Sequence, residues 1–566
     1  MATALAPPAR TKQADLDRTA NRLKAAAPHF AALTISKRRR LLDSMSAGYA
    51  RIAAAAVRAA CEAKGIPLGS PLEGEEWSLG PVITLHNLRL LRGSLASLER
   101  SGSTRVGTCD RTVDGRVRVE VFPATVLDRV LFARVRARVH LQPGALAEDR
   151  ARFYREPNRT GALVLILGAG NVNAITPLDV TTKMFNEGKV CLVKMNPVNA
   201  YLGPFLETAF TEAIAQDFLA ITYGGADEGG YLAAHPAVDE IHLTGSDRTH
   251  DALVWGVPGP DRKARKAAGN PRLTKPVTSE LGNISPVIVV PGAYTERQLA
   301  WQAENIAGGV TNNASFNCNA HKMLISGGGQ KSGSDLVDRI EQVLRSVPPR
   351  VAYYPGAASR YAALTAGRQR MVRLGQETAG TLPWALIRDL DPADRTDPAF
   401  TTEPFCAVLS QTSLDTDDPL EFLDRAVRLA NAQLWGTLVA TIVVPPAMRA
   451  DPVLSAALDR AIATLRYGTI GINIWGAYGF ALGPPWGGHP SSTLADIQSG
   501  LGFVHNTAML EGVEKTVLEQ PIVNLPKPIH FPGHRSADSL GRRLAAVEAR
   551  GSWLAVGPVI SAALRG

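Results

Sequence analysis

The fold of this chain is decided by one stretch, residues 162–173, which reads Ala-Leu-Val-Leu-Ile-Leu-Gly-Ala-Gly-Asn-Val-Asn. A short unbroken apolar run that ends in glycine predicts a strand buried on both faces. Gly168 and Gly170 allow close approach of the backbone, and the Asn171 side chain could donate a hydrogen bond to an oxyanion. Gly-x-Gly without a third glycine is a weak dinucleotide-binding signal, and a plain strand-to-helix turn fits equally well.

Outward from this stretch, apolar segments alternate with helical ones. Strands are predicted at residues 190–195, 220–223, 240–243 and 287–290, and helices at residues 177–187, 203–215 and 229–234. This alternation predicts βαβ units and a parallel sheet of the dinucleotide-binding kind. A second strand–helix series follows from about residue 300 to 475, so we expect an α/β protein.

The remaining segments predict other structure. Apolar positions at helical spacing predict helices within residues 14–66 and 75–100. Residues 117–121 alternate Val with charged side chains, which indicates a strand, and residues 130–139 suggest a further strand or two. Residues 261–275 are basic and contain Gly and Pro, which predicts a solvated surface loop.

The composition excludes several classes of protein. With 566 residues, of which 45% are hydrophobic and 20% charged, the chain can bury more than one core, unlike a disordered or collagen-like chain. The net charge of +9 comes from basic residues scattered along the chain without interleaved aromatic residues. We therefore expect a soluble basic enzyme with no nucleic-acid partner.

The spacing of the cysteines and the first residues of the sequence indicate where in the cell the protein is expected. The five cysteines show no CxxC or Cys/His ligand spacing, which indicates neither a disulfide framework nor a metal site, and favours a reducing, cytoplasmic location. Arg10, Lys12 and Asp15 precede any apolar run, so no signal peptide is expected. The apolar stretches fall short of the ~18–20 residues that a membrane span needs.

Cys318 and Glu280 are the candidate reactive groups. Cys318 lies in the segment Thr311-Asn-Asn-Ala-Ser-Phe-Asn-Cys-Asn-Ala320 and could be a nucleophile in an electropositive, partly exposed setting, although a lone Cys is more often a buried structural residue. Glu280 lies at an element boundary before the strand at 287–290. Desolvation there would raise its pKa and make it a general base, although a single Glu is usually a surface residue.

Two glycine-rich segments could hold a phosphate group. Gly225 and Gly229 lie at the start of a predicted helix, where unpaired backbone N–H groups favour an anion. The strand at 240–243 continues into Thr-Gly-Ser, where Gly245 and Ser246 offer amide and hydroxyl groups. Each segment by itself could equally be an ordinary loop between a sheet and a helix.

In their order along the chain, these motifs resemble the NAD(P)-dependent aldehyde dehydrogenase superfamily. The matching residues, spanning roughly 155–490, are Arg155-Glu-Pro with Gly161, Gly170-Asn171, Leu192-Val-Lys194, Gly225 with Gly229, His235 through Ser246, Glu280-Leu-Gly282, Cys318, Glu403-Pro-Phe405, Gly468-Thr469 and Pro485-Trp-Gly-Gly488. The resemblance implies oxidation of an aldehyde to the carboxylic acid with NAD or NADP as cofactor.

The resemblance also implies residue roles. Cys318 would add to the aldehyde to form a thiohemiacetal and then a thioester, Asn171 with the Cys318 backbone amide would form the oxyanion hole, and Glu280 would activate water. The implied cofactor contacts are Lys194 at the adenosine ribose, Gly225 and Gly229 beside the adenine, Gly245 and Ser246 at the pyrophosphate, and Glu403 and Phe405 at the nicotinamide ribose and ring.

The fold that the resemblance implies has two Rossmann-type parallel-sheet domains and a β oligomerisation arm. The expected division is a cofactor-binding domain of residues 1–139 and 158–281, a catalytic domain of 282–480, an arm of 140–157 and 508–520, and a C-terminal tail of 521–566. A homodimer or homotetramer built through the arm is implied.

The sequence departs from the family pattern in several places. Pro197 stands where many members carry an acidic residue that binds the ribose 2′-hydroxyl; without that carboxylate a 2′-phosphate is not repelled, so NADP becomes more plausible and NAD is not assured. Ser315-Phe316 replaces a Gly-Gln pair, and only Asp496 lies near the position of a second Glu. The Gly-Asn-Val turn at Asn171 is more similar to acyl-CoA reductases, so a CoA-acylating enzyme is the alternative, although the presence of Glu280 favours hydrolysis.

The sequence restricts the choice of substrate and the role of the tail less than it restricts the reaction. The stretch from Trp475 to Phe480, with Phe316, would line a substrate tunnel and suggests an apolar aldehyde, of medium to long chain or aromatic, although ordinary packing would explain it nearly as well. The tail helix around 553–560 could cover the tunnel mouth, touch a membrane or dock on a neighbouring subunit, and docking is expected.

Overall fold

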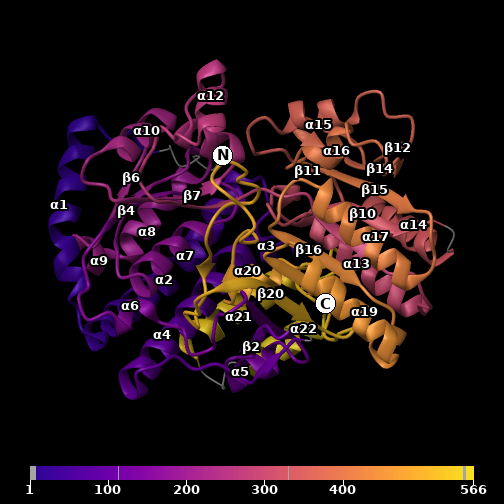
Figure 1. The fold of residues 1–566 in the computed structure, drawn as a ribbon, viewed down its shortest axis with the longest axis horizontal. Helices are drawn as coiled ribbons and strands as arrows, with labels where there is room; N and C mark the ends of the chain where they lie inside the picture. Colours follow the sequence, from indigo (N-terminus) through magenta and orange to yellow (C-terminus); the bar gives the residue numbers. More distant parts are fainter. Residues whose placement is uncertain (1–7, 113, 329–330, 552–555) are drawn as a thin grey trace.

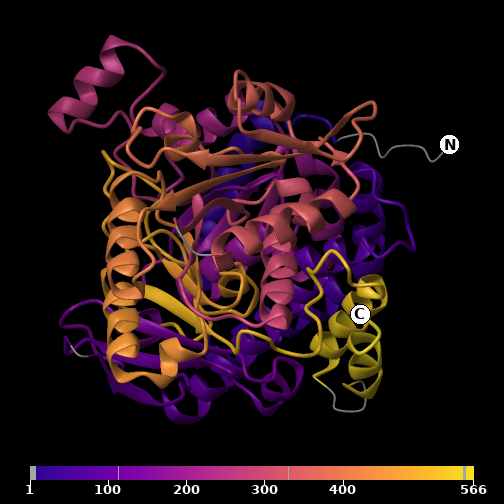
Figure 2. The same cartoon turned by 90° about the vertical axis from the view of Figure 1, so that its right-hand side faces the viewer.

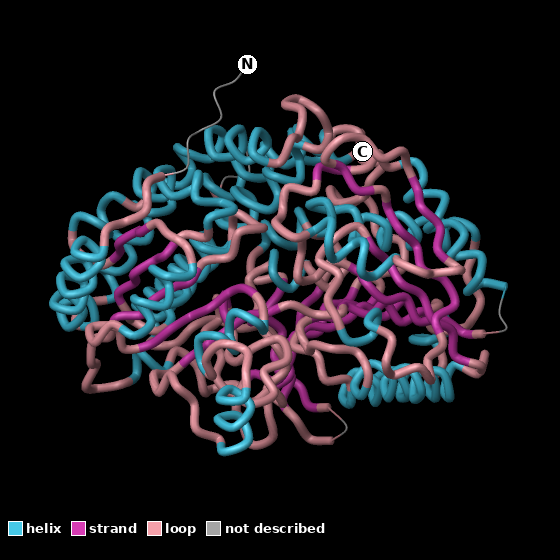
Figure 3. The backbone as a smooth tube through the Cα atoms, turned by 90° about the horizontal axis from the view of Figure 1, so that it is seen from above, coloured by secondary structure: helices cyan, strands magenta, loops and turns pink. Residues whose placement is uncertain are grey.

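The computed structural model describes residues 8–112, 114–328, 331–551 and 556–566. Two sheets organise the chain, one of 5 strands and one of 11 strands. Figure 1 shows them side by side, and Figure 3 shows the strands of both enclosed between helices. Each sheet has its own hydrophobic core, because the helices that cover it bury their apolar faces against its strands.

The smaller sheet is parallel throughout, in the order β6-β5-β4-β7-β8. Its strands are β4 (Leu163–Leu167), β5 (Val190–Lys194), β6 (Leu219–Thr222), β7 (Glu240–Gly245) and β8 (Val277–Leu281). Every residue of β4 and β5 is buried, as expected for continuous apolar runs covered by helices on both faces. The first four strands confirm the strand–helix alternation expected from the sequence. β8 was not expected, because its sequence Val-Thr-Ser-Glu-Leu has no apolar pattern.

The larger sheet has the order β1-β2-β3-β20-β17-β16-β9-β10-β15-β14-β12. Its strands are β1 (Cys109–Arg111), β2 (Val117–Phe122), β3 (Arg136–Leu141), β9 (Ser285–Val289), β10 (His321–Gly327), β12 (Met371–Leu374), β14 (Trp384–Leu390), β15 (Val408–Leu414), β16 (Val439–Val443), β17 (Thr469–Ile472) and β20 (Val513–Glu519). The strands from β20 to β14 are parallel, and those at either edge are antiparallel.

The helices and short strands complete the fold. The helices are α1 (Gln13–Ala31), α2 (Ile35–Ala63), α3 (Glu73–Trp77), η1 (Ser78–Val82), α4 (Ile83–Ser101), α5 (Val126–Leu131), α6 (Arg152–Arg155), α7 (Ile175–Thr181), η2 (Thr182–Asn186), η3 (Pro197–Leu202), α8 (Gly203–Ala209), α9 (Thr211–Ala215), α10 (Ala226–Ala234), α11 (Asp247–Val254), α12 (Pro260–Ala268), α13 (Glu296–Thr311), η4 (Asn312–Ser315), α14 (Lys331–Ser346), α15 (Ala357–Thr365), α16 (Pro398–Thr401), α17 (Pro419–Ala432), α18 (Ala447–Ala450), α19 (Pro452–Thr464), α20 (Tyr478–Ala481), α21 (Ala537–Arg550) and α22 (Val556–Ala563). Two further pairs of short strands are β11 (Arg350–Val351) with β13 (Thr381–Leu382) and β18 (Pro485–Trp486) with β19 (Val504–His505). Among the described residues, no helix has the length and apolar character needed to cross a membrane.

The strands before residue 142 belong to the larger sheet. The sequence-based division placed residues 1–139 in the cofactor-binding domain, but β3 pairs antiparallel with β20, and β20 pairs parallel with β17. The two segments expected to form an arm also lie together, since Arg150 and Leu510 form a bridge. Hydrogen bonding thus joins β1, β2 and β3 to strands from the far end of the chain, a pairing that local sequence patterns do not reveal.

Two segments differ from the structure expected of them. Within residues 261–275, the expected loop, the chain forms α12, which has no buried residue and ends at Gly269 with a left-handed φ of 61°. Figure 2 shows α12 projecting from the body of the molecule. Before β3, the helix α5 begins with a capping box made by Thr125 and Asp128, so its apolar residues lie on a helix rather than a strand.

The C-terminal tail packs on its own chain. Helix α21 lies against α3 and α4, and the backbone of Ala537 comes so close to Gly74 that a Cβ there would lie 2.4 Å from it. Glu548 of α21 is buried and accepts hydrogen bonds from Arg89 (2.6 Å) and His86 (3.0 Å). The chain itself thus covers this face of α21. The helix expected around 553–560 falls partly in α22, which packs against α21, and its docking on a neighbouring subunit stays a prediction. Residues 553–555 of the expected helix lie outside the described part.

Candidate active site

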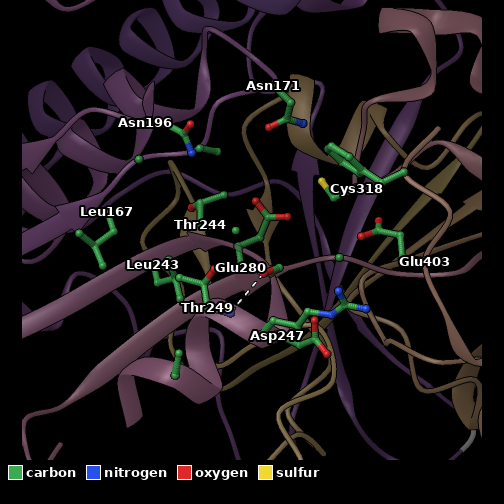
Figure 4. A pocket seen from close by; sticks show the side chains of 18 of the residues that line it. Leu167, Asn171, Asn196, Leu243, Thr244, Asp247, Thr249, Glu280, Cys318 and Glu403 are labelled. Carbon is green, nitrogen blue, oxygen red and sulfur yellow. Dashed lines mark hydrogen bonds between the residues drawn. The ribbon is translucent and has the colours of Figure 1, made fainter. Parts of the chain in front are cut away.

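A cavity of about 600 Å³ lies between the two sheets, at the carboxyl ends of strands β4, β5 and β7. In open α/β sheets, ligands bind at this edge of the strands. The residues predicted from the sequence all line the cavity: Asn171, Lys194, Gly225, Gly229, Gly245, Ser246, Glu280, Cys318, Glu403 and Phe405. Figure 4 shows Asn171, Cys318, Glu280 and Glu403 around one space. The structure thus brings together residues that are distant in the sequence.

A second, smaller cavity of about 110 Å³ meets the first at Cys318 and Ile175, which line both. Its lining is largely apolar and includes Trp475, Tyr478 and Phe480 from the stretch expected in the tunnel. Leu544 of the tail helix α21 and His530 also line it, which the sequence did not indicate.

The expectation that Phe316 lines the tunnel is wrong. Its side chain is buried among aromatic rings, with centroids 4.9 Å from Tyr353, 5.8 Å from Tyr354 and 5.9 Å from Phe405. Edge-to-face and stacked rings at these distances stabilise one another. Phe316 therefore packs under the loop that carries Cys318, and it is not among the residues that line the second cavity.

Cys318 lies in the loop between η4 and β10, and the backbone before it is strained. Asn313, Ala314 and Ser315 have φ values of 53°, 53° and 69°. Each non-glycine residue in this left-handed region costs about 1–3 kcal/mol and persists only where its surroundings hold it. The loop is therefore held in place at a conformational cost, which is typical of functional sites.

Buried polar contacts hold this loop. The Asn313 side chain donates to the carbonyl oxygens of Asn171 (3.0 Å) and Phe316 (3.1 Å). Its own oxygen accepts from Lys64 Nζ (3.0 Å) and Tyr353 OH (2.9 Å). These bonds tie the turn at Asn171 to the loop at Cys318.

Asn171 faces the thiol loop with its amide group. Its Nδ2 donates one hydrogen bond to the carbonyl oxygen of Phe316, at 2.9 Å. An amide nitrogen has two N–H donors, so a second remains for a ligand in the cavity. Because Asn171 and Cys318 both line this cavity, an oxygen bound next to the sulfur could receive that hydrogen bond.

Glu280 lies on β8, with 2% of its surface exposed. Burial raises its pKa to about 8; its hydrogen bond with the Cys318 thiol opposes this rise, and the negative charge of Asp179 adds to it. Its Oε1 has no hydrogen-bond partner among the described residues. A carboxyl group with a pKa near the working pH, next to a thiol and open to a cavity, is suited to accept protons there.

The surroundings of the Cys318 thiol favour its protonated form. Burial raises its pKa well above the ordinary value, the Glu280 carboxylate raises it further, and the Lys322 ammonium lowers it. Thiolate is the nucleophilic form, so the thiol must lose its proton as the sulfur reacts. Glu280 lines the same cavity and acts electrostatically on the thiol, so it is the group that can take this proton.

Lys322 is a buried cation that the sequence reasoning missed. Its side chain is 1% exposed, and Nζ donates to Glu403 Oε1 (2.6 Å) and to the carbonyl oxygens of Cys318 (3.2 Å), Asn317 (2.9 Å) and Asn283 (3.0 Å). It joins the Cys318 loop to Glu403. A lysine at the start of the apolar strand β10 was the one signal that could have identified it.

Replacing Lys322 with methionine is expected to lower the free energy of unfolding by about 3–5 kcal/mol, because a half-buried carboxylate and three carbonyl groups lose a buried donor. Urea unfolding of the purified variant measures this change. Lys527→Met is the matched control, since the Lys527–Glu304 pair is 3.4 Å long and partly exposed and should cost less than about 1 kcal/mol. Equal losses in both variants would contradict the assignment.

The other end of the cavity is suited to an anion. The N-termini of α10 and α11 begin at Gly225 and Ser246, and both residues line the cavity. Unpaired N–H groups and the helix dipole favour phosphate at such positions. Lys194 lies at the end of β5, where burial lowers its pKa and the Glu228 carboxylate opposes that change. Arg248 also lines this part, and the sequence reasoning did not include it.

The glycine after β8 is required by a close approach. A Cβ on Gly282 would lie 2.0 Å from Glu403 Oε2. Glu403 Oε1 in turn accepts a hydrogen bond from the Asn283 backbone N–H, at 3.1 Å. The Glu-Leu-Gly motif thus places Glu280 in the cavity and leaves room for Glu403 in the next loop.

Comparison of sequences gives a limited result. No protein-family model matches the chain. Over 81 residues the chain is 36% identical to the chloroplastic betaine aldehyde dehydrogenase of Beta vulgaris, and this match covers 14% of each chain. The matched region is therefore a small part of that relative.

Comparison of structures covers nearly the whole chain. A structure of NADP-dependent glyceraldehyde-3-phosphate dehydrogenase from Bacillus halodurans, complexed with NADP, matches 90% of this chain and 92% of its own, with a TM-score of 0.60 and 18% identity. A variant of aldehyde dehydrogenase C from Pseudomonas syringae, complexed with NAD+ and octanal, matches 91% of each chain, with a TM-score of 0.61 and 16% identity. The chain has the fold of the aldehyde dehydrogenases, which confirms the predicted α/β class.

Proposed function

We propose that this chain, which has the aldehyde dehydrogenase fold, is an NAD(P)-dependent enzyme that oxidises an apolar aldehyde to the carboxylic acid. The observation that carries the proposal is the position of Cys318. Its side chain lines both cavities, one with helix N-termini and basic residues and the other largely apolar, and the Glu280 carboxyl group lines the first cavity with it. A thiol that meets a cofactor-sized space and an apolar space is suited to hold a substrate between them.

The residues of the larger cavity fit a nicotinamide dinucleotide. Lys194, Gly225 and Gly229 would hold the adenosine end, and Gly245 with Ser246 would hold the pyrophosphate at the α11 N-terminus. Glu403 and Phe405 would hold the nicotinamide ribose and ring. When bound, the cofactor would supply the acceptor for the hydrogen and two electrons that the substrate carbon loses. Pro197 leaves no carboxylate at the usual 2′-hydroxyl position, so both NAD and NADP fit this proposal.

The protein groups would act in two stages. In the first, Cys318 Sγ adds to the aldehyde carbon, Glu280 accepts the thiol proton, and the Asn171 side chain and the Cys318 backbone N–H donate to the new oxyanion. Glu280 then releases this proton, so that in the second stage it accepts a proton from water as the water oxygen attacks the thioester. The C–S bond breaks, and the sulfur regains a proton from the product acid, which leaves as the carboxylate. The same donors serve both tetrahedral species.

The apolar cavity supports an apolar substrate of medium to long chain or with an aromatic ring. Trp475, Tyr478, Phe480 and Leu544 line it, and His530 is held neutral, since burial lowers its pKa to about 3. A charged aldehyde would lose its hydration there without gaining a partner. Leu544 brings the tail into the substrate site, so the tail would cover the tunnel.

The oligomeric state, the domain boundaries and the cellular location of the protein are also part of this proposal. Residues 140–157 and 508–520 would form the arm of a homodimer or homotetramer, which is supported by the exposed side chain of Leu146. The other proposed divisions are a cofactor-binding domain that includes residues 158–281, a catalytic domain of 282–480 and a tail of 521–566. All five cysteines are free, which supports a reducing, cytoplasmic location.

A turnover screen tests the function. Straight-chain aldehydes of increasing length and one aromatic aldehyde are offered with NAD or with NADP, and Cys318→Ala is the blank. We expect kcat/KM to rise with chain length, by about 3- to 4-fold per buried CH₂ until the cavity is filled. Product analysis with and without CoA follows. Faster formation of acyl-CoA than of free acid would favour the CoA-acylating alternative, and no turnover of any aldehyde would refute the proposal.

A further inference from the structure

A buried polar cluster lies directly behind Glu280. Asp179 of α7 accepts a hydrogen bond from Thr244 Oγ1 at 3.1 Å and lies 3.4 Å from His242 Nε2. The other ring nitrogen of His242, Nδ1, lies 2.9 Å from Thr278 Oγ1. Asp179 and His242 are each 1% exposed and Thr244 is 5% exposed, while Thr278 is half-buried. The cluster therefore runs from the cavity wall towards the surface.

Strand register aligns the cluster with Glu280. In the parallel pair β7 and β8, Thr244 lies opposite Glu280 and His242 lies opposite Thr278. Residues two apart on a strand share a face, and adjacent strands are about 4.8 Å apart, so the four side chains form a ladder on one face. Thr244 and Glu280 both line the larger cavity, and Figure 4 shows them next to each other.

The composition of the cluster is not explained by packing. A buried carboxylate is costly unless it is paired, and among the described residues only His242, and no Lys or Arg, forms an ion-pair contact with Asp179. An apolar residue on α7 would fill this place at less cost. The proposed reaction, in turn, leaves Glu280 with a proton that it must release at every turnover.

We propose that Asp179 and His242, reached through Thr244, form the route by which Glu280 releases the proton that it takes from water. Glu280 gives its proton to Thr244 Oγ1 as the Thr244 hydroxyl gives its own to Asp179 Oδ2. Asp179 and His242 then share the proton, and His242 passes one from Nδ1 to Thr278 and to solvent. In these steps only O–H and N–H bonds break and form. One proton enters the route from Glu280, and one proton leaves it to solvent. This inference rests on the proposed function.

Other ionisable groups face this route and must be kept constant in its test. Cys318 and Glu403 face Glu280 from the large-sheet loops. His505 of β19 interacts with Asp179 and His242, and its own pKa is lowered to about 4 by burial. Removing the charge of Asp179 would by itself lower the pKa of Glu280, so a shifted pH profile must be distinguished from a lost route.

The test uses hydrolysis of 4-nitrophenyl acetate by the full chain without cofactor. The ester acylates Cys318 in a burst of 4-nitrophenolate, and the steady rate then reports hydrolysis of the thioester. In Asp179→Asn and His242→Gln we expect an unchanged burst and a steady rate lower on the order of 10²-fold at every pH. Added imidazole or formate should restore part of that rate. His489→Gln, which alters a 3.4 Å His–carboxylate contact at a residue that lines neither cavity, should keep both phases.

The outcomes separate the inference from the function on which it rests. A normal steady rate in both variants would overturn the inference. A pH profile that only shifts to lower pH in Asp179→Asn, with His242→Gln unchanged, would also overturn it and leave Asp179 an electrostatic role. A wild-type protein with no Cys318-dependent burst would refute the proposed function itself. If Asp179→Asn fails to fold, His242→Gln decides, because it keeps the carboxylate.

Discussion

Cys318→Ala is expected to lower aldehyde oxidation by ~10⁴-fold or more, while the affinity for NAD or NADP changes little. The sulfur is the only group in the proposed reaction that bonds to the substrate, so its loss removes the covalent route rather than slowing it. The groups proposed for the cofactor lie on other elements, at the ends of β5 and β7 and the N-termini of α10 and α11. Steady-state turnover and fluorescence titration with the reduced cofactor measure the two quantities.

Cys191→Ala is the matched control for this variant. Cys191 is also buried, lies on β5 in the same sheet as Glu280, and lines neither cavity. Its replacement should cost some stability but keep most of the turnover. Turnover in Cys318→Ala within about tenfold of the wild type would mean that another group performs the chemistry, and the assignment of Cys318 would be wrong.

The strands that were predicted correctly are those whose own sequence is an apolar run and therefore indicates burial. In β4 and β5 all residues are buried, so an unbroken apolar run sufficed to find them. β8 was missed, because its side chains Thr278, Ser279 and Glu280 are polar; Glu280 lines the cavity and Thr278 belongs to the cluster behind it. Strand β8, which carries the proposed catalytic residue Glu280, is thus the strand that an apolar sequence pattern does not predict.

The residues of the site likewise fall into two groups: those that sequence motifs predict, and those whose position depends on contacts between distant segments of the chain. Motif order placed Cys318, Glu280 and Asn171 in one cavity, because each motif keeps its residue at a fixed element end. Lys322 and the tail residue Leu544 came from no motif. Their roles depend on which strand or helix of the folded chain lies next to them, and Leu544 lies 226 positions along the chain from Cys318. The family resemblance placed Phe316 in the tunnel, whereas its ring packs against Tyr353, Tyr354 and Phe405.

Burial of Glu280 also makes stability depend on pH. Its ordinary pKa is 4.5 and its pKa in the fold is raised to about 8. Between these values the folded protein keeps a proton that the unfolded chain has released, so this group makes the fold less stable as the pH rises through that window. A neutral amide at this position would remove the dependence.

Glu280→Gln is accordingly expected to lower the steady turnover by about 10³-fold. A burst of reduced cofactor of one equivalent per active site should remain, but it should form more slowly than in the wild type, because the amide cannot take the thiol proton. The amide cannot accept a proton from water, so the thioester on Cys318 accumulates. The wild-type steady rate should rise with pH through about 8, as Glu280 loses its proton, and the variant rate should be flat there. Stopped-flow absorbance of the reduced cofactor across this pH range measures both.

The same variant discriminates between the two ways of ending the reaction. Asp496→Asn is its control: Asp496 lies near the position of the family's second Glu but lines neither cavity, so the variant should behave like the wild type. If water ends the reaction, hydroxylamine should release the acyl group that Glu280→Gln retains, and CoA should accelerate neither protein. If CoA restores full turnover to Glu280→Gln, the carboxylate is not needed for transfer to a thiol, and the enzyme makes acyl-CoA. Steady turnover of Glu280→Gln at the wild-type rate without CoA would show that Glu280 does not act in the mechanism. The raised pKa of its carboxyl group would then not indicate that this group accepts a proton during turnover.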